Sequence, residues 1–302
     1  MVQASGARGT VANLVIPSRL AQSARDDPCS ARRAWVNRLP GVVARLAEQW
    51  SLRLGAPFEP GGSCSWVAAA DGADGQALVL KVGWRHEEAE SEADGLRLWA
   101  GRGAVILVNA HAADDVSALL LERCRPGTAL ASRLPEPEQD LVIAGLLQRL
   151  WGAAPGDEPF RPLQQMCDAW ASEFEDRLNA SPALPDPGLA HAALELLRNL
   201  PASAGHTRLL ATDLHAGNVL ASEREPWLVI DPKPYLGDPA YDCVQHILNC
   251  DTRLADDPVG LVARMAGLLD LDAERVRQWL FARCMLESID QPVLGLLAAK
   301  LL

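Results

Sequence analysis

The sequence predicts an α+β fold in two lobes, with an antiparallel, β-rich N-terminal lobe and a mainly helical C-terminal lobe. Short apolar runs separated by turns rich in Gly and Asp occupy residues 55–124, the pattern of antiparallel strands. After Pro126 the apolar residues recur at steps of three and four, which is typical of amphipathic helices. The change of texture predicts an N-terminal domain over residues 1–124 and a C-terminal domain over 125–302.

The elements of the N-terminal domain follow in order. Apolar spacing predicts a helix over residues 35–54. Residues 57–83 predict short strands joined by Gly-rich turns and ending in the apolar run ALVLKV. An exposed helix is expected at 86–101, and two further strands at 104–108 and 117–124. Together these make a small antiparallel sheet with one inserted helix.

The C-terminal domain is predicted from three amphipathic segments and one strand–loop–strand unit. The helices are expected at 136–153, 162–180 and 189–199. The sequence RLLATDLHAGNVLASEREPWLVIDP, residues 208–232, then predicts two strands with a loop between them. From Pro239 onward the chain is expected to be mainly helical.

Composition narrows the class of partner. The net charge is −11, which disfavours nucleic acid as the main partner and suits a cationic small molecule. The seven cysteines form no C-x-x-C pair, so neither a zinc site nor a redox motif is predicted. No run of 18 apolar residues and no signal-peptide core is present, so no membrane span and a cytoplasmic location are expected.

The segment DLHAGN carries the strongest chemical signal. Asp213 stands five residues before Asn218, and the strand WLVI then leads to Asp231. Phosphoryl transfer needs such a set, because one carboxylate orients the acceptor hydroxyl while a second carboxylate and an amide oxygen bind Mg²⁺. The alternative is that each residue is an ordinary turn or cap residue. The order of the three residues, with strands on both sides, favours the catalytic interpretation.

Two features of the N-terminal domain suggest a nucleotide site. Lys81 stands in an apolar strand, and a buried ammonium needs an anionic partner such as an ATP phosphate or Glu92 of the next helix. Alternatively, Lys81 lies on the solvent face of an edge strand. Gly61, Gly62 and Ser63 would bring backbone N–H groups close to phosphate, although adjacent glycines also make simple turns.

Other polar residues near these motifs are interpreted structurally. In GDPAYD, either Asp238 or Asp242 is expected to hold the neighbouring loop by accepting backbone N–H bonds at a helix start. His215 is expected to brace the loop, since a hydroxyl acceptor with Asp213 as base requires no histidine.

With these residues in place, the chain resembles the aminoglycoside phosphotransferase family of the protein-kinase-like superfamily. The streptomycin 6-phosphotransferase branch is the most similar, with hydroxyurea phosphotransferases close by. The matching segments are ALVLKVGWRHEEAESEADGLRLWAG, LLLERCRPG, LLATDLHAGNVL and EPWLVIDPKPYLGDPAYD.

The resemblance implies ATP and Mg²⁺ as cofactors and a role for each matching residue. Asp213 takes the position of the catalytic base, and Asn218 and Asp231 those of the metal ligands. Lys81, paired with Glu92, would hold the α- and β-phosphates. The backbone of Leu121–Cys124, including Glu122 and Cys124, would bind adenine. One departure is Ala211-Thr212, where small-molecule kinases of this type usually carry His-Gly.

A streptomycin-like acceptor would bring guanidinium groups, which pair with carboxylates. The acidic candidates are Asp168, Glu173, Glu175, Asp176, Glu287 and Asp290 on C-terminal helices, with Asp238 beside them. Each of them also fits a solvated helix face. Two alternatives to this function remain open: a kinase for hydroxyurea, viomycin or a metabolic alcohol, and a pseudokinase that binds nucleotide without turnover. A protein kinase is disfavoured, because no A-P-E motif follows Asp231.

Overall fold

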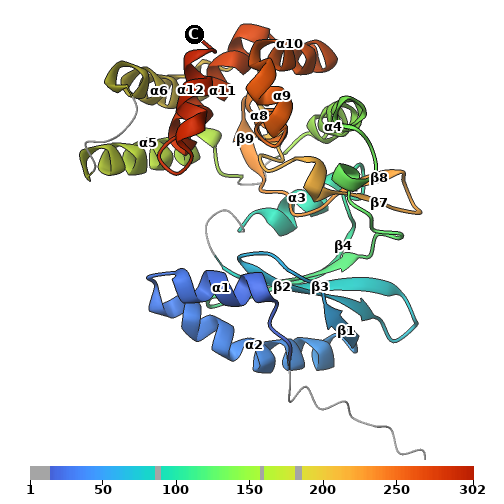
Figure 1. Cartoon of the computed structure of the whole chain (residues 1–302). Helices are drawn as coiled ribbons and strands as arrows, with labels where there is room; N and C mark the ends of the chain where they lie inside the picture. Colours follow the sequence, from blue (N-terminus) through green and yellow to red (C-terminus); the bar gives the residue numbers. More distant parts are fainter. Residues whose placement is uncertain (1–13, 86–89, 157–159, 181–185) are drawn as a thin grey trace, which may run out of the picture. The chain divides into compact units, whose positions relative to one another are not determined.

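The computed structural model describes residues 14–85, 90–156, 160–180 and 186–302. It divides into two compact units (Figure 1). The first unit runs to Glu90 and resumes over Ile106–Arg123, and the second comprises Ser91–Val105 and Cys124–Leu302. The sequence-based boundary after residue 124 lies one residue from this division, but Ser91–Val105 groups with the second unit.

The first unit is built on a five-stranded sheet of order β1-β2-β3-β5-β4, in which every pair is antiparallel. Its elements are α1 (Ser18–Asp26), α2 (Ser30–Gln49), β1 (Arg53–Pro57), β2 (Ser65–Asp71), β3 (Ala77–Trp84), β4 (Leu107–Ala113) and β5 (Val116–Glu122). Lys81 of β3 lies opposite Val67 of β2 and Leu119 of β5. It therefore stands on the central strand, and the edge-strand alternative is wrong.

The bounds of the predicted elements shift in the structure, most clearly at the end of the first helix and at the start of one strand. The helix predicted to reach residue 54 ends at Gln49, because Leu54 already pairs with Ala70 in the sheet. The strand predicted over 104–108 begins only at Leu107, because Val105 donates its backbone N–H to Val229 in the second unit. Backbone hydrogen bonds decide where α2 ends and where β4 begins, and the spacing of apolar residues does not reveal them.

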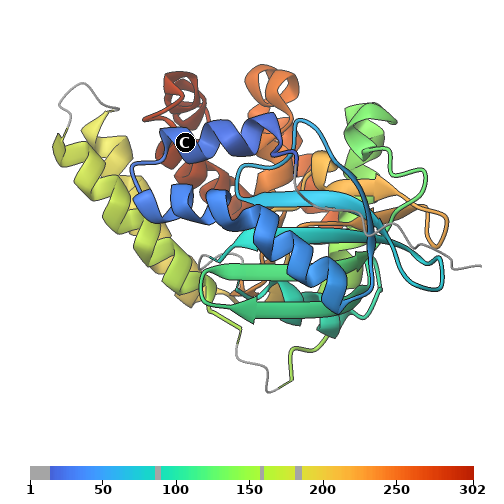
Figure 2. The same ribbon diagram turned by 90° about the horizontal axis from the view of Figure 1, so that it is seen from below.

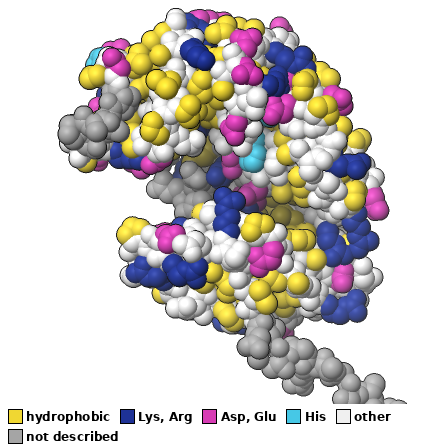
Figure 3. Space-filling view, viewed as in Figure 1, with side chains coloured by type: hydrophobic (Ala, Val, Ile, Leu, Met, Phe, Trp, Pro, Cys, Tyr) yellow, Lys and Arg dark blue, Asp and Glu magenta, His cyan; other side chains and the backbone are white. Residues whose placement is uncertain are grey.

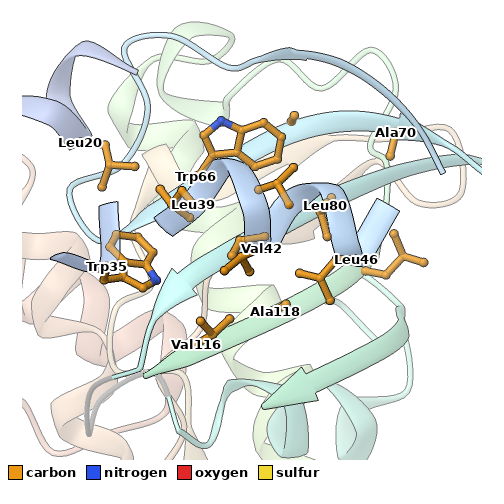
Figure 4. Close-up of a cluster of buried hydrophobic side chains, with 14 of the residues drawn as sticks. Leu20, Trp35, Leu39, Val42, Leu46, Trp66, Ala70, Leu80, Val116 and Ala118 are labelled. Atoms are coloured by element: carbon orange, nitrogen blue, oxygen red, sulfur yellow. The ribbon is translucent and has the colours of Figure 1, made fainter. Parts of the chain in front are cut away.

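The core of the first unit forms where α2 crosses one face of the sheet (Figure 2). Trp35, Leu39 and Leu46 of α2 lie at helical spacing and face Trp66 and Leu80 of the strands (Figure 4). All five side chains are at most 3% exposed. Burial of these apolar faces is the main force that joins helix and sheet.

The second unit contains the mainly helical region and two small β-ladders. Its helices are α3 (Glu92–Trp99), α4 (Glu136–Trp151), α5 (Leu163–Ala180), α6 (Pro187–Asn199), α7 (Pro239–Asp242), α8 (Val244–Leu248), α9 (Asp251–Asp256), α10 (Pro258–Leu269), α11 (Ala273–Glu287) and α12 (Pro292–Ala299). The strands are β6 (Arg208–Leu210), β7 (Val219–Ala221), β8 (Trp227–Val229) and β9 (Tyr235–Gly237), with short 3₁₀ turns η2 (Leu130–Ser132), η3 (Pro201–Ser203) and η4 (Ala216–Asn218).

The three predicted helices correspond to α4, α5 and α6, with ends that differ by at most two residues. The predicted strand–loop–strand unit corresponds to β6, the loop and β8, with a third strand, β7, that was not predicted between the loop and β8. The strand β9 was not predicted, since three residues are too few to show a period.

Helix α3 packs within the second unit. A Cβ placed on Gly95 would lie only 2.4 Å from Pro234 Cγ, so glycine allows the helix to approach the segment after Asp231. Trp99 Nε1 also donates to the carbonyl oxygen of Leu150 in α4, at 3.2 Å. The prediction placed α3 in the N-terminal domain, and these contacts explain why it groups with the second unit. Residues 86–89 of the predicted helix lie outside the described residues.

Charged side chains of both signs occur in several small groups on the face shown in Figure 3. In the described part of the chain, no helix is both long enough and apolar enough to cross a lipid bilayer.

We expect Leu39→Ala to lower the free energy of unfolding by about 2–5 kcal/mol, because Leu39 is fully buried between α2 and the sheet. Urea unfolding measures the change. Arg45→Ala on the exposed face of the same helix is the control and is expected to have little effect. Equal effects of the two substitutions would contradict the packing described here.

Candidate active site

The loop that carries Asp213 is positioned by two short β-ladders. Strands β6 and β9 pair through Leu209 and Leu236, and β7 and β8 pair through Leu220 and Leu228. Asp213 follows β6 and Asp231 follows β8, so the ladders bring together segments that are far apart in the sequence. The backbone N–H of Lys233 donates to the carbonyl of Ala211 at 2.9 Å and joins them directly.

Asn218 links the two aspartate segments. Its side-chain Nδ2 donates to the backbone carbonyl of Asp213 at 3.0 Å, and its own carbonyl accepts the N–H of Ile230 at 2.9 Å. The structure thus brings Asp213, Asn218 and Asp231 into one hydrogen-bonded loop system. With Nδ2 engaged, Oδ1 is the atom of Asn218 suited to bind a cation.

Two residues of this system have left-handed backbone conformations. Thr212 has φ of +50° and Asp231 has φ of +53°. Such a conformation costs on the order of 1–3 kcal/mol for a residue that is not glycine, and it persists only where surrounding contacts fix it. Thr212 Oγ1 donates to the carbonyl of Lys233 at 2.5 Å, which is one of those contacts.

Asp242 supplies the main support of the loop. Its Oδ1 accepts the backbone N–H of Thr212 at 2.7 Å, and its Oδ2 accepts Trp151 Nε1 at 2.8 Å. The N–H of Ala211 is 3.1 Å from both oxygens. The side chain is fully buried, and burial raises the pKa of Asp242 to about 6 despite these donors. Of the two aspartates considered, Asp242 therefore holds the loop, but it does so from the end of α7 and through N–H groups of the loop itself.

Asp238 caps the helix that begins beside it. The carboxylate accepts the backbone N–H of Ala240 at 3.0 Å, and its second oxygen accepts from Arg275 Nε and Trp279 Nε1, both at 2.6 Å. The residue is 3% exposed. These contacts give Asp238 the capping role and occupy the carboxylate that was also considered for acceptor binding.

Sequence reasoning missed Lys233. Its Nζ lies 3.1 Å from Asp213 Oδ2, and both side chains are partly buried. The ammonium therefore holds the carboxylate proposed as catalytic base. The only signal in the sequence was the place of this lysine in IDPK, two residues after Asp231.

His215 braces the loop, as predicted. Its Nδ1 accepts the backbone N–H of Gly217 at 3.2 Å and caps the 3₁₀ turn η4. Burial of the ring lowers the pKa of His215, with Asp213 acting in the opposite direction. The neutral ring therefore carries its proton on Nε2.

The donor set fits a hard divalent cation. Asp231 and Asn218 offer carboxylate and amide oxygens, the atoms that Mg²⁺ prefers, on adjoining segments that share a backbone hydrogen bond. No histidine or cysteine ligand is required. These residues would hold Mg²⁺.

The Gly61–Ser63 turn makes close contacts inside the first unit. Gly61 has φ of +78°, and a Cβ there would lie 2.6 Å from Pro17 Cβ, so the turn packs against the start of α1. The carbonyl of Ser63 accepts from Arg32 of α2. Lys81 lies on β3 of this unit, whereas Glu92 begins α3 in the second unit and is 3% exposed.

The predicted adenine segment spans the end of β5. The backbone N–H of Glu122 donates to the carbonyl of Ile106, and its Oε2 accepts the N–H of Ile106 at 3.0 Å. The backbone N–H of Glu122 is therefore already engaged with the segment that leads into β4. Cys124 is buried at the start of the next segment.

The acidic candidates of α5 and α11 have different surroundings. Asp290 forms a bidentate pair with Arg177 at 2.6 and 3.0 Å, and Glu287 pairs with Arg283 at 2.9 Å. Asp168 accepts from Gln164 at 2.8 Å, while Glu173 is an exposed residue of the same helix. Glu173, Glu287 and Asp290 all act electrostatically on Arg177, so the structure brings these three together.

Comparison with known proteins identifies the relatives of this chain. The profile of the family described as "Aminoglycoside/hydroxyurea antibiotic resistance kinase" matches residues 54–291. A streptomycin 6-kinase of Streptomyces griseus is 34% identical over 287 residues, which cover 91% of this chain and 90% of that protein. A hydroxyurea phosphotransferase of Kitasatospora aureofaciens is 35% identical over 287 residues, covering 92% and 82% respectively.

The fold also has relatives among solved structures. The choline kinase of Streptococcus pneumoniae superposes with a TM-score of 0.55 at 13% identity, over 87% of this chain and 91% of that one. The protein-kinase-like fold predicted from the sequence is thereby confirmed.

We expect the free energy of unfolding of wild type to fall relative to that of His215→Asn as the pH drops below 6.5, the ordinary pKa of histidine, because unfolded His215 binds a proton that the folded protein disfavours. In His215→Asn this contribution disappears, while the amide oxygen can still cap η4. Urea unfolding between about pH 5.5 and 7.5 measures both proteins.

In both wild type and His215→Asn, Asp242 changes the free energy of unfolding with pH in the direction opposite to His215. Its raised pKa adds stability as the pH falls below about 6. The difference between wild type and His215→Asn therefore isolates the histidine. A difference that does not vary with pH would show that His215 is not buried as described.

Proposed function

The chain belongs to the aminoglycoside/hydroxyurea antibiotic resistance kinase family, and we propose that it transfers the γ-phosphate of ATP to the 6-hydroxyl of a streptomycin-like aminoglycoside. At the level of the family, it is an ATP-dependent small-molecule kinase. The streptomycin acceptor, the Mg²⁺ and the residue roles given below are proposals. Phosphorylation would add about −1.5 to −2 charge to the drug and so weaken its fit to an anionic target, which would confer resistance.

One observation carries the proposal: Asp213, Asn218 and Asp231 share a single hydrogen-bonded loop system. Asp213 would accept the proton of the attacking hydroxyl. Asp242 and Asn218 fix the backbone on either side of it, so the carboxylate is positioned before the acceptor binds. Positioning and charge neutralisation supply most of the rate in phosphoryl transfer.

Asn218 and Asp231 would hold Mg²⁺, which neutralises charge on the phosphates. We assign Lys81 to the α- and β-phosphates with Glu92 as its partner. Gly61, Gly62 and Ser63 are assigned to the phosphate-binding turn. Adenine recognition is assigned to the backbone of Leu121–Cys124, in which the N–H of Glu122 is already engaged with Ile106.

Hydroxyurea is the second candidate acceptor. The hydroxyurea phosphotransferase of Kitasatospora aureofaciens and the streptomycin 6-kinase of Streptomyces griseus are almost equally identical to this chain, at 35% and 34%. The motifs at Asp213 and Asp231 concern ATP, metal and proton transfer, which both acceptors need. Only turnover of each acceptor separates the two.

We expect ADP release from Mg²⁺·ATP to depend on streptomycin and to fall about a hundredfold to ten-thousandfold in Asp213→Asn, which cannot act as the base. Asp270→Asn, an exposed residue at a helix end, is the matched control. Hydroxyurea is assayed in parallel. ADP release that hydroxyurea stimulates and streptomycin does not would make hydroxyurea the acceptor. No ADP release with any acceptor of a broad panel would favour the pseudokinase alternative.

Lys233→Met is expected to lower kcat about tenfold to a hundredfold, since the Asp213 carboxylate loses the ammonium at 3.1 Å that fixes its position. KM for ATP is expected to change little. Lys300→Met, near the C-terminus, is the control. An unchanged kcat in Lys233→Met would show that the ion pair has no part in the reaction.

A further inference from the structure

A polar pocket of about 450 Å³ lies within the second unit, against the back of the loop that joins Asp213 to Asn218. Its walls include Glu136 and Gln139 from the start of α4, His215–Gly217 from the loop, and His246 and Asn249 at α8. Its volume falls in the range of small-molecule sites. No residue assigned above to catalysis, metal or nucleotide lies on α4 or α8.

His246 lines this pocket and has one ring nitrogen without a hydrogen-bond partner among the described residues. The ring is 1% exposed, and Nε2 lies 2.9 Å from Asp140 Oδ1. Burial opposes ionisation of Asp140, but hydrogen bonds from His246, Arg253 and Arg264 hold the pKa of Asp140 well below its usual range. An ionised carboxylate only accepts, so Nε2 carries the proton. In the neutral ring Nδ1 is then an acceptor, and it has no hydrogen-bond partner among the described residues.

Asp140, His246 and Cys250 are close enough together for a metal ion, but the carboxylate already pairs with two positively charged side chains. Both oxygens of Asp140 accept from Arg253, at 2.8 and 3.0 Å, and Arg264 Nε lies 2.6 Å from Oδ2. Two guanidinium groups on one carboxylate disfavour a further cation there. This network therefore serves to hold the His246 ring in place.

Glu136 contributes a second acceptor, and this one is anionic. Its Oε2 is buried and makes no hydrogen bond within the described part of the chain. Arg253 Nη1 lies 3.8 Å away, an ion-pair distance that is too long for a hydrogen bond. A buried carboxylate oxygen without a donor costs free energy that a ligand N–H would recover.

The amides of the pocket add further acceptors. Gln139 Nε2 donates to the carbonyl of Leu134 at 2.7 Å, and Asn249 Nδ2 donates to the carbonyl of Gln245 at 2.8 Å. Each amide nitrogen carries a second hydrogen, so both side chains can still offer a ligand a donor as well as an acceptor oxygen. The amides therefore suit polar ligands in general, and the negative charge of Glu136 favours a cation among them.

We propose that this pocket binds a cationic, N–H-rich group of the acceptor, such as a guanidinium or a protonated amine, through Glu136 and His246. The inference rests on the function proposed above and extends it to acceptor recognition. An anion is disfavoured by Glu136, and an apolar group would leave both buried acceptors unsatisfied. The loop between Asp213 and Asn218 forms one wall, so a group bound here is anchored to the segment that carries the base.

The test compares Glu136→Gln with Glu138→Gln. Both glutamates are in the first turn of α4, but Glu138 is exposed and does not line the pocket. With streptomycin as the guanidinium-bearing probe, Glu136→Gln is expected to raise KM for the acceptor about tenfold to a hundredfold, since a charge-assisted bond is lost. kcat and KM for ATP are expected to stay within about twofold, as are all constants of Glu138→Gln.

Two kinetic results would overturn the inference and leave the proposed function standing. An unchanged acceptor KM in Glu136→Gln would show that the pocket has no part in recognition. A raised KM for ATP alone would assign the pocket to a nucleotide hydroxyl.

If wild type turns over no acceptor, the proposed function fails, and binding is measured instead. Calorimetric titration of streptomycin into the three proteins then tests the pocket by itself. Binding weakened tenfold or more only in Glu136→Gln supports the inference. Equal binding by all three proteins, or no binding by any, rejects it.

Discussion

The loop at the centre of this protein depends on one buried carboxylate, that of Asp242. It accepts the backbone N–H groups of Ala211 and Thr212 and the indole N–H of Trp151. These bonds fix Thr212 in a left-handed conformation that would otherwise be unfavourable. The cost is visible in the raised pKa of Asp242, because burial opposes the charge that the donors stabilise. This anchor fixes the backbone just before Asp213, while Lys233 and Asn218 hold the carboxylate and the carbonyl of Asp213 itself.

The loop held by Asp242 carries several residues with proposed functional roles. Near one end of the loop, the Asp213 carboxylate pairs with Lys233. At the other end, Asn218 bonds to the carbonyl of Asp213 and accepts the N–H of Ile230, just before Asp231. The residues between them form a wall of the pocket that Glu136 and His246 also line. One short segment thus carries the proposed base, a proposed metal ligand and a contact for the proposed acceptor group. Such coupling places the acceptor and the phosphoryl group relative to one rigid element.

Much of this was predictable because the chemistry is local in sequence. The motif from Asp213 to Asn218 stands between two apolar strands, and that order alone indicated the loop and its roles. The helix start predicted in GDPAYD is capped by Asp238, whereas Asp242 at the end of α7 holds the loop. Helix α3 groups with the second unit and not with the N-terminal segments that precede it, since its partners Pro234 and Leu150 are distant in sequence. The sequence analysis missed Lys233 and Glu136, because the role of a single charged residue depends on which residues lie next to it in the folded structure.

The sequence by itself determined the family, the two-part α+β architecture and the residues of the DLHAGN loop, since these depend on periodicity and on motifs whose spacing is short. The tertiary structure decided which segments meet. It paired β6 with β9, placed Lys233 on Asp213, and gathered Glu136 and His246 around one pocket. The reason is physical: hydrogen bonds, ion pairs and desolvation act between atoms a few ångströms apart, whatever the separation of their residues along the chain.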